Sequence, residues 1–167
     1  MKVLDVVTKL RESPKFKAWQ SKNKQAKLVH IFLMLEPNQP VMYDIGFYDA
    51  KKELMTSFVL DEEAKSIETS ESKDVFKQED DIIKPLEEAK IKVCFTEACK
   101  TCRELQQSKY KQHTPMKEIV ILQNLPIGQV WNITYITSTM QTLNMKVDAE
   151  TGKILEEKLH QIFGFDK

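Results

Sequence analysis

Residues 42–49 read MYDIGFYD and residues 130–137 read VWNITYIT, and these two stretches decide the fold. Each places an aromatic residue, an isoleucine and a second aromatic residue at alternate positions, as a β-strand with one buried face does. The flanking runs also correspond: 27–35 and 117–125 precede the two stretches, and 54–61 and 142–148 follow them. The offset between the copies is constant within each run, as expected because a slip inside a strand would turn core residues to solvent. The sequence therefore predicts two copies of one β-meander.

This duplication predicts an α+β fold made of two tandem helix-plus-antiparallel-β-meander units, with the helices packed on one sheet face. We expect an N-terminal helix–meander half at residues 1–62, an acidic linker at 63–81 and a C-terminal half at 82–167. Nine acids and three lysines crowd residues 61–81, a composition typical of a linker. Because residues 1–30 hold eight basic and two acidic residues, the acidic segment is expected to lie near the N-terminal helices of its own chain.

Apolar residues at helical spacing predict the helices of each half. An apolar stripe near the N-terminus predicts one helix, and Ser13 followed by Pro14 predicts the N-cap and first turn of a second. In the C-terminal half, Thr96 predicts the N-cap of a helix that runs to about Tyr110. Two further helices are expected, one opened by Ile82, Ile83 and Leu86, and one from Ile154 to Phe163.

The overall composition is that of an ordinary soluble protein. Of its 167 residues, 41% are hydrophobic and 30% are charged, which is enough to bury a core. No stretch approaches the apolar length of a membrane span, and the first residues read as an amphipathic helix, not a signal peptide. The three cysteines, an odd number between residues 94 and 102, fit a reducing compartment better than a disulfide framework. We therefore expect a cytoplasmic protein without membrane partners.

Three segments of the C-terminal half carry a family resemblance. They are FTEAC from Phe95, VWNITY from Val130, and LNMKVDAETGKI from Leu143 to Ile154. Together they resemble a PepSY-type module, a small cystatin-like α+β domain, over roughly the last 75 residues. The whole chain also resembles small uncharacterised archaeal proteins that carry a Phe-Lys-Ala-Trp-like segment before the first strand. The PepSY resemblance implies roles in inhibition, chaperoning or ligand sensing, and it brings no catalytic residues.

The one chemically suggestive spacing is Cys99-Lys-Thr-Cys102. If Thr96 caps the helix, Cys99 lies in its first turn, where the helix dipole stabilises a thiolate, so a redox pair is one interpretation. The favoured interpretation is that both cysteines are small apolar residues on the buried face of the helix. A structural zinc needs a second pair of ligands that the sequence does not supply near Cys94, so we expect no metal.

A second candidate is a group of lysines around Trp19, which we call the basic patch. It could hold a phosphate backbone, with the tryptophan as a stacking platform. The chain as a whole is not basic, and no nucleic-acid-binding motif accompanies the lysines, so a solvated helix face is the favoured interpretation. The members of the basic patch are Lys15, Lys17, Lys22, Lys24 and Lys27.

No pattern in the chain demands a reaction. His30, His113 and His160 are scattered, with no serine or aspartate constellation in the sequence around them, and the four glycines form no phosphate-binding loop. We therefore expect a non-enzymatic binding or regulatory protein without a cofactor, whose ligand is a peptide, a protein or a small molecule. A thiol–disulfide oxidoreductase and a weak nucleic-acid-binding protein are the alternatives, and self-association into a homo-oligomer is left open.

Overall fold

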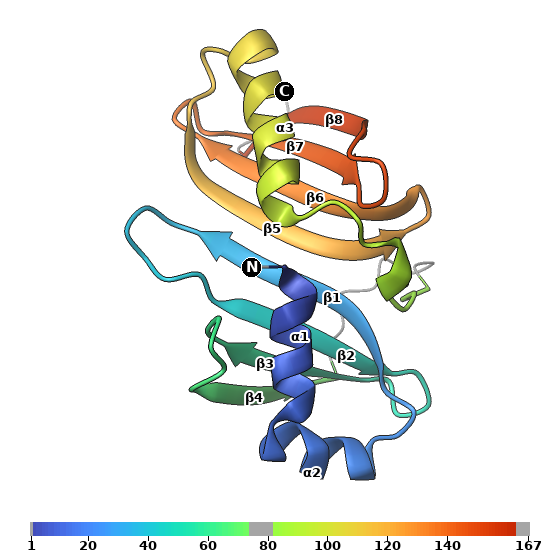
Figure 1. Cartoon of the computed structure of the whole chain (residues 1–167). Helices are drawn as coiled ribbons and strands as arrows, with labels where there is room; N and C mark the ends of the chain where they lie inside the picture. The colour runs from blue at the N-terminus through green and yellow to red at the C-terminus, as the bar shows by residue number, and fades with distance from the viewer. Residues whose placement is uncertain (1, 74–81, 163–167) are drawn as a thin grey trace.

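The computed structural model describes residues 2–73 and 82–162 of the chain. Its strands are β1 (Lys27–Leu35), β2 (Tyr43–Asp49), β3 (Leu54–Leu60), β4 (Ile67–Ser72), β5 (Pro115–Leu125), β6 (Gly128–Thr137), β7 (Gln141–Asp148) and β8 (Ile154–Gln161). They form one antiparallel sheet in the order β4-β3-β2-β1-β5-β6-β7-β8 (Figure 1). The helices are α1 (Val3–Glu12), α2 (Pro14–Lys22), the 3-10 helix η1 (Glu88–Lys90) and α3 (Phe95–Lys109).

The expected pair of tandem helix-plus-meander units is wrong, because the strands belong to a single eight-stranded sheet. β1 pairs with β5 from His30–Gln123 to Leu35–Glu118, so the two runs expected to open separate meanders are joined edge to edge. The pairing satisfies two rows of backbone groups that separate meanders would leave free. The internal repeat says nothing about this joint, because both arrangements use the same strand pattern.

Most of the expected strands and helices are confirmed. β1 and β7 occupy 27–35 and 141–148, and the other four expected strands match within two residues. Ser13 caps α2 as predicted, because the Phe16 N–H donates to its Oγ at 3.2 Å. The predicted cap of α3 is wrong by two residues: Cys94, not Thr96, is the N-cap, and its backbone N–H donates to Glu97 Oε2 at 3.0 Å.

The two further expected helices are wrong. The segment from Ile154 forms the edge strand β8, because the turn at Asp148 sends the chain back antiparallel to β7. Asp148 Oδ1 accepts the N–H groups of Glu150 and Thr151 at 2.9 and 2.7 Å, and Gly152 adopts φ +76° to complete that turn. Phe163, where the helix was expected to end, lies outside the described residues.

The second of these wrong helices was expected to open at Ile82. The described residues before η1 form no helix there, and the chain instead lies against the sheet. The Leu86 N–H donates to the Leu28 carbonyl at 2.8 Å, and Lys84 bridges Asn124. The expected linker also differs, because residues 67–72 form the edge strand β4; residues 74–81 lie outside the described residues.

The hydrophobic core lies between the helices and one face of the sheet. Figure 1 shows α1 crossing the half that holds β1 to β4, and α3 crossing the half that holds β5 to β8. Trp131, Ile133 and Tyr135 are buried on this face, whereas the alternate residues Asn132 and Thr134 are half-buried, so the predicted alternation is confirmed. Other buried residues of the core are Val3, Val6, Val7, Leu10, Phe16, Ile31, Leu33, Ile45, Phe58, Leu143 and Met145.

We expect Trp131→Ala to lower the free energy of unfolding by about 3–5 kcal/mol, as for a large buried aromatic residue. The ring is 0% exposed, and its Nε1–H donates to the Val93 carbonyl at 2.9 Å, which ties β6 to the segment before α3. Trp131→Phe keeps much of the ring volume and should cost less. Denaturant unfolding of both variants measures this, and a loss below about 1 kcal/mol for the alanine variant would place Trp131 outside the core.

Candidate functional site

The sheet face opposite α1 and α3 carries no helix in the described part of the chain, and we call it the open face. The strand register assigns its residues, because partners across a ladder point to the same side of a sheet. One row crosses all eight strands through successive partners. In strand order from β4 to β8, this row holds Glu68, Val59, Asp44, Phe32, Ile121, Asn132, Lys146 and Glu156.

The middle of the open face is apolar. Phe32 and Ile121 are direct partners across the β1–β5 joint, and Met34 and Ile119 form the next pair of the same face. Phe32, Ile119 and Ile121 are half-buried, and Met34 is 41% exposed. We call these four residues the apolar strip. It lies over the joint that the sequence did not predict, so neither half of the chain contains it alone.

A polar cluster lies beside the apolar strip, on the side of β2 and β3. His30 Nε2 lies 3.7 Å from Asp44 Oδ1, and a Cβ atom at Gly46 would stand only 2.1 Å from His30 Cε1. The imidazole ring therefore rests directly on the backbone of β2, where only glycine leaves room for it. Sequence reasoning missed this cluster and treated His30 as isolated. The sequence shows these polar residues at alternate positions of three strands, but it does not show the register that brings them together.

Asp44 is the charged centre of this cluster. Burial raises the pKa of Asp44, but the polar side chains of His30 and Ser57 beside it and the charge of His30 lower it by more, so the pKa lies below its usual 3.8. The carboxylate is therefore ionised at neutral pH. Its Oδ1 is buried and has no hydrogen-bond partner among the described residues, and 3.7 Å from His30 is an ion-pair distance, too long for a hydrogen bond.

The cluster fits binding better than covalent catalysis. Asp44 is the shared partner of His30 and Ser57, whereas a nucleophilic triad places the histidine between the serine and the carboxylate. The polar groups on the far side of the apolar strip already satisfy one another. Asn144 donates to Asn132 Oδ1 at 2.6 Å and to Thr134 Oγ1 at 2.8 Å. Asp44 thus stands out on the open face as a partly exposed anion.

A cleft of about 700 Å³ lies elsewhere, where the first turns of α1 and α3 approach each other. Three of its donors are already used: the Lys2 N–H donates to Asp5 Oδ2 at 3.1 Å, and Cys94 donates through its backbone and its thiol to Glu97 Oε2. The carboxylates offset the positive ends of both helix dipoles. The two carboxylates therefore make the cleft a poor site for an incoming anion.

The structure places the predicted redox pair inside the core. Cys99 and Cys102 are 4% and 0% exposed between α3 and the sheet. Burial raises the pKa of both thiols, and the neighbouring Glu118 carboxylate raises it further, to about 12 for Cys102. A thiolate, the reactive form, is strongly disfavoured there, which supports the interpretation of these residues as core packing.

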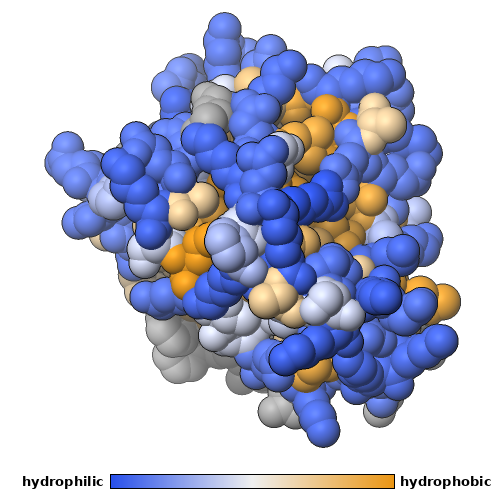
Figure 2. All heavy atoms as spheres, turned by 60° about the horizontal axis from the view of Figure 1, so that its bottom comes forward, coloured by the Kyte–Doolittle hydropathy of each residue, from blue (hydrophilic) through white to orange (hydrophobic). Residues whose placement is uncertain are grey.

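The lysines of the basic patch are all exposed and lie at the α2 end of the molecule. Figure 2 brings this end forward and shows hydrophilic residues over most of it, with apolar residues between them. Lys15 donates to the Ile67 carbonyl of β4, and Lys9 of α1 donates to the Glu62 carbonyl at 3.0 Å, so the described start of the acidic segment lies beside the basic helices.

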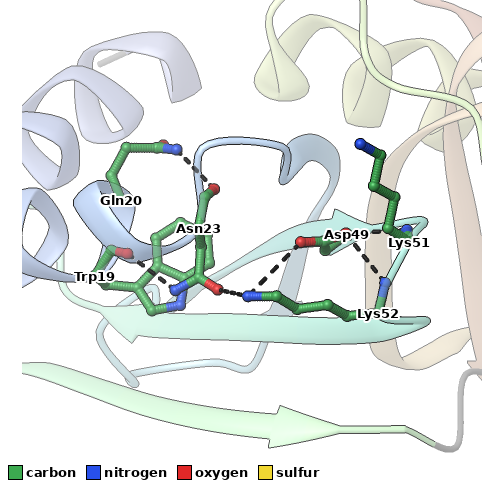
Figure 3. A network of polar contacts seen from close by, with 6 residues as sticks. All are labelled: Trp19, Gln20, Asn23, Asp49, Lys51 and Lys52. Carbon is green, nitrogen blue, oxygen red and sulfur yellow. Dashed lines mark hydrogen bonds and ion pairs between the residues drawn. The ribbon is translucent and has the colours of Figure 1, made fainter.

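The ring of Trp19, the predicted stacking platform of the basic patch, packs against other aromatic rings of the chain. Its ring centroid lies 5.1 Å from Phe58 and 5.5 Å from Phe47, inside an aromatic cluster. Its carbonyl accepts Asn23 Nδ2–H at 2.9 Å, and Lys52 donates to Asn23 Oδ1 at 2.8 Å (Figure 3). A base could stack on this indole only after the cluster rearranged.

Among the described residues, histidine, cysteine and acidic side chains form no group that could hold a metal ion. The helices in the same ranges are all too short or too polar to cross a membrane.

Comparison with known proteins supports the fold alone. No protein-family model matches the chain, and no curated protein matches it. A crystal structure of "a putative lipoprotein" from Clostridium difficile 630 is similar, with a TM-score of 0.56 and 14% identity. The match covers 87% of this chain and 90% of that one. The resemblance to PepSY modules therefore stays a prediction, as does the cytoplasmic location.

We expect the cysteines to differ sharply in reactivity. Cys94 is half-buried at the edge of the cleft, whereas Cys99 and Cys102 are in the core. In the native protein an alkylating reagent should therefore label Cys94 first, and the other two only at the rate of unfolding. A Cys94→Ser variant serves as the control and should show slow labelling throughout. Rapid labelling of Cys99 at neutral pH in that variant would restore the oxidoreductase hypothesis.

We expect Asp44 to stabilise the protein only where it is ionised. Because its pKa is lowered on folding, its contribution is present above the unfolded pKa and is lost as the pH falls through the folded pKa. The gap in unfolding free energy between wild type and Asp44→Asn should shrink between about pH 6 and about pH 3. Glu104→Gln, at an exposed residue of α3, is the matched control, and a gap for Asp44→Asn that stays constant would contradict the expectation.

Proposed function

We propose that this protein is a non-enzymatic binding protein that holds a protein or peptide ligand on its open face. The observation that carries the proposal is the apolar strip beside an ionised, partly exposed carboxylate, on a sheet face without a helix in the described residues. Half-exposed apolar side chains at the centre of a surface, surrounded by polar residues, are typical of interaction sites.

The size of the open face favours a macromolecular ligand. Eight strands at the usual spacing span roughly 35 Å, and strands of this length extend for about 20 Å, so the face offers on the order of 700 Å². A stable protein interface buries about 800 Å² on each partner, whereas a small molecule needs an enclosed pocket. The cleft described above lies on the helix side, outside this face.

The two alternative functions have less support. An oxidoreductase would need an accessible thiolate, and Cys99 and Cys102 are buried with raised pKa values. A nucleic-acid-binding surface would need free lysines around an available aromatic ring, and Lys15 and Trp19 already have partners within the chain. We therefore retain the binding function. In this proposal, the helix side of the sheet supports the fold and does not bind the ligand.

We expect Ile121→Lys to abolish ligand binding without unfolding the protein. Ile121 is half-buried in the apolar strip, so a lysine there can reach solvent but breaks the apolar contact with a ligand. Ile127→Lys makes the same exchange at a 45% exposed residue in the β5–β6 turn and is the matched control. Both variants and wild type would be immobilised and offered an extract of the source cells, after thermal unfolding has shown that they fold.

Partners held by wild type and by Ile127→Lys, but lost from Ile121→Lys, would support the open face as the binding surface. The affinity of an isolated partner should fall at least about tenfold for Ile121→Lys, the usual effect of a central interface residue. A partner that binds all three proteins equally would contradict the proposal.

A further inference from the structure

We infer that the ligand presents a lysine or arginine side chain to Asp44 and, two residues away along an extended segment, an apolar side chain to the apolar strip. This inference rests on the proposed function and adds the chemistry of the ligand to it.

The first step is the charge of Asp44. The carboxylate is ionised at neutral pH, and although Oδ1 is buried, the Asp44 side chain as a whole is 33% exposed. A ligand that covers the open face removes water from this side chain, and a covered charge without a further partner costs free energy. A ligand with a donor at this point is therefore strongly preferred.

The second step is the charge of the row to which Asp44 belongs. On its β4 side the row holds Val59 and then Glu68, and on its other side Phe32 and Ile121. The cation of the row, Lys146, already forms an ion pair with Glu156 near the opposite edge. The β2–β4 part of the row is thus acidic, with His30 as the neighbour of Asp44 that can carry a positive charge. A cationic group on the ligand therefore matches the local charge.

The third step is spacing. Asp44 and Phe32 are direct partners on neighbouring strands, so their side chains start about 5 Å apart, and Ile121 lies about one strand further. In an extended segment, side chains two residues apart lie on one side and are separated by about 7 Å. A segment that crosses the strands can therefore place a basic residue over Asp44 and an apolar residue over the Phe32–Ile121 pair.

The test uses random peptides displayed on phage, selected on the immobilised full-length protein. We expect the enriched peptides to share a lysine or arginine two residues from an apolar residue. Synthetic versions should bind Asp44→Asn about tenfold or more weakly than wild type, the usual effect of losing a charge-assisted hydrogen bond. Added salt should weaken binding to wild type more than binding to Asp44→Asn. Binding to Ile127→Lys should be unchanged.

The outcomes separate this inference from the proposed function. Peptides that lack the basic residue, or that bind Asp44→Asn as tightly as wild type while being lost from Ile121→Lys, would overturn the inference and leave the open face as a binding surface. Peptides that bind Ile121→Lys as tightly as wild type would overturn both. Failure to enrich any peptide above an uncoated surface would also overturn the inference, since it predicts that a short extended segment suffices.

Discussion

The pairing of β1 with β5 sets the architecture of the whole sheet. It runs antiparallel from His30–Gln123 to Leu35–Glu118 and turns two meanders into one sheet. The joint pairs the edges of β1 and β5 with each other, so the sheet ends at β4 and β8, whose residues are mostly exposed. Charged residues such as Glu68 and Lys158 on these strands oppose pairing with other sheets.

The joint also determines which face of the sheet is available to bind a ligand. α1 and α3 bury one side of the sheet under a continuous core, in which Trp131 and the two cysteines of the CxxC pair are packing residues. The other side keeps the residues that meet only across the joint. Phe32 and Ile121 come from different halves of the chain, and Asp44 lies one strand away from Phe32 on the opposite side from Ile121. The binding surface proposed above is thus a product of the same contact that builds the sheet.

Local constraints hold the polar cluster in place. Gly46 leaves the space that the His30 ring fills, and Ser57 and His30 hold Asp44 ionised while one of its oxygens stays without a hydrogen-bond partner in the described residues. The core side contains comparable groups, since Tyr135 Oη and Glu118 Oε1 are buried without a partner in the same ranges. Groups of this kind usually bind ordered water. The difference is the exposure of the whole side chain: Asp44 is 33% exposed and can meet a ligand, whereas Tyr135 is buried in the core.

Local sequence pattern alone determined the strands, since the alternation at Trp131, Ile133 and Tyr135 follows from the pleat of a strand. It also determined the cap at Ser13, which needs only the serine side chain and the first turn of the helix that follows. The residues from Ile154 suit a helix or a strand equally well, so the free edge of β7 decided them. Whether the meanders join, and whether His30 meets Asp44, depends on the register between segments distant in the sequence. No local pattern encodes that register, so only the tertiary structure could bring the candidate site together.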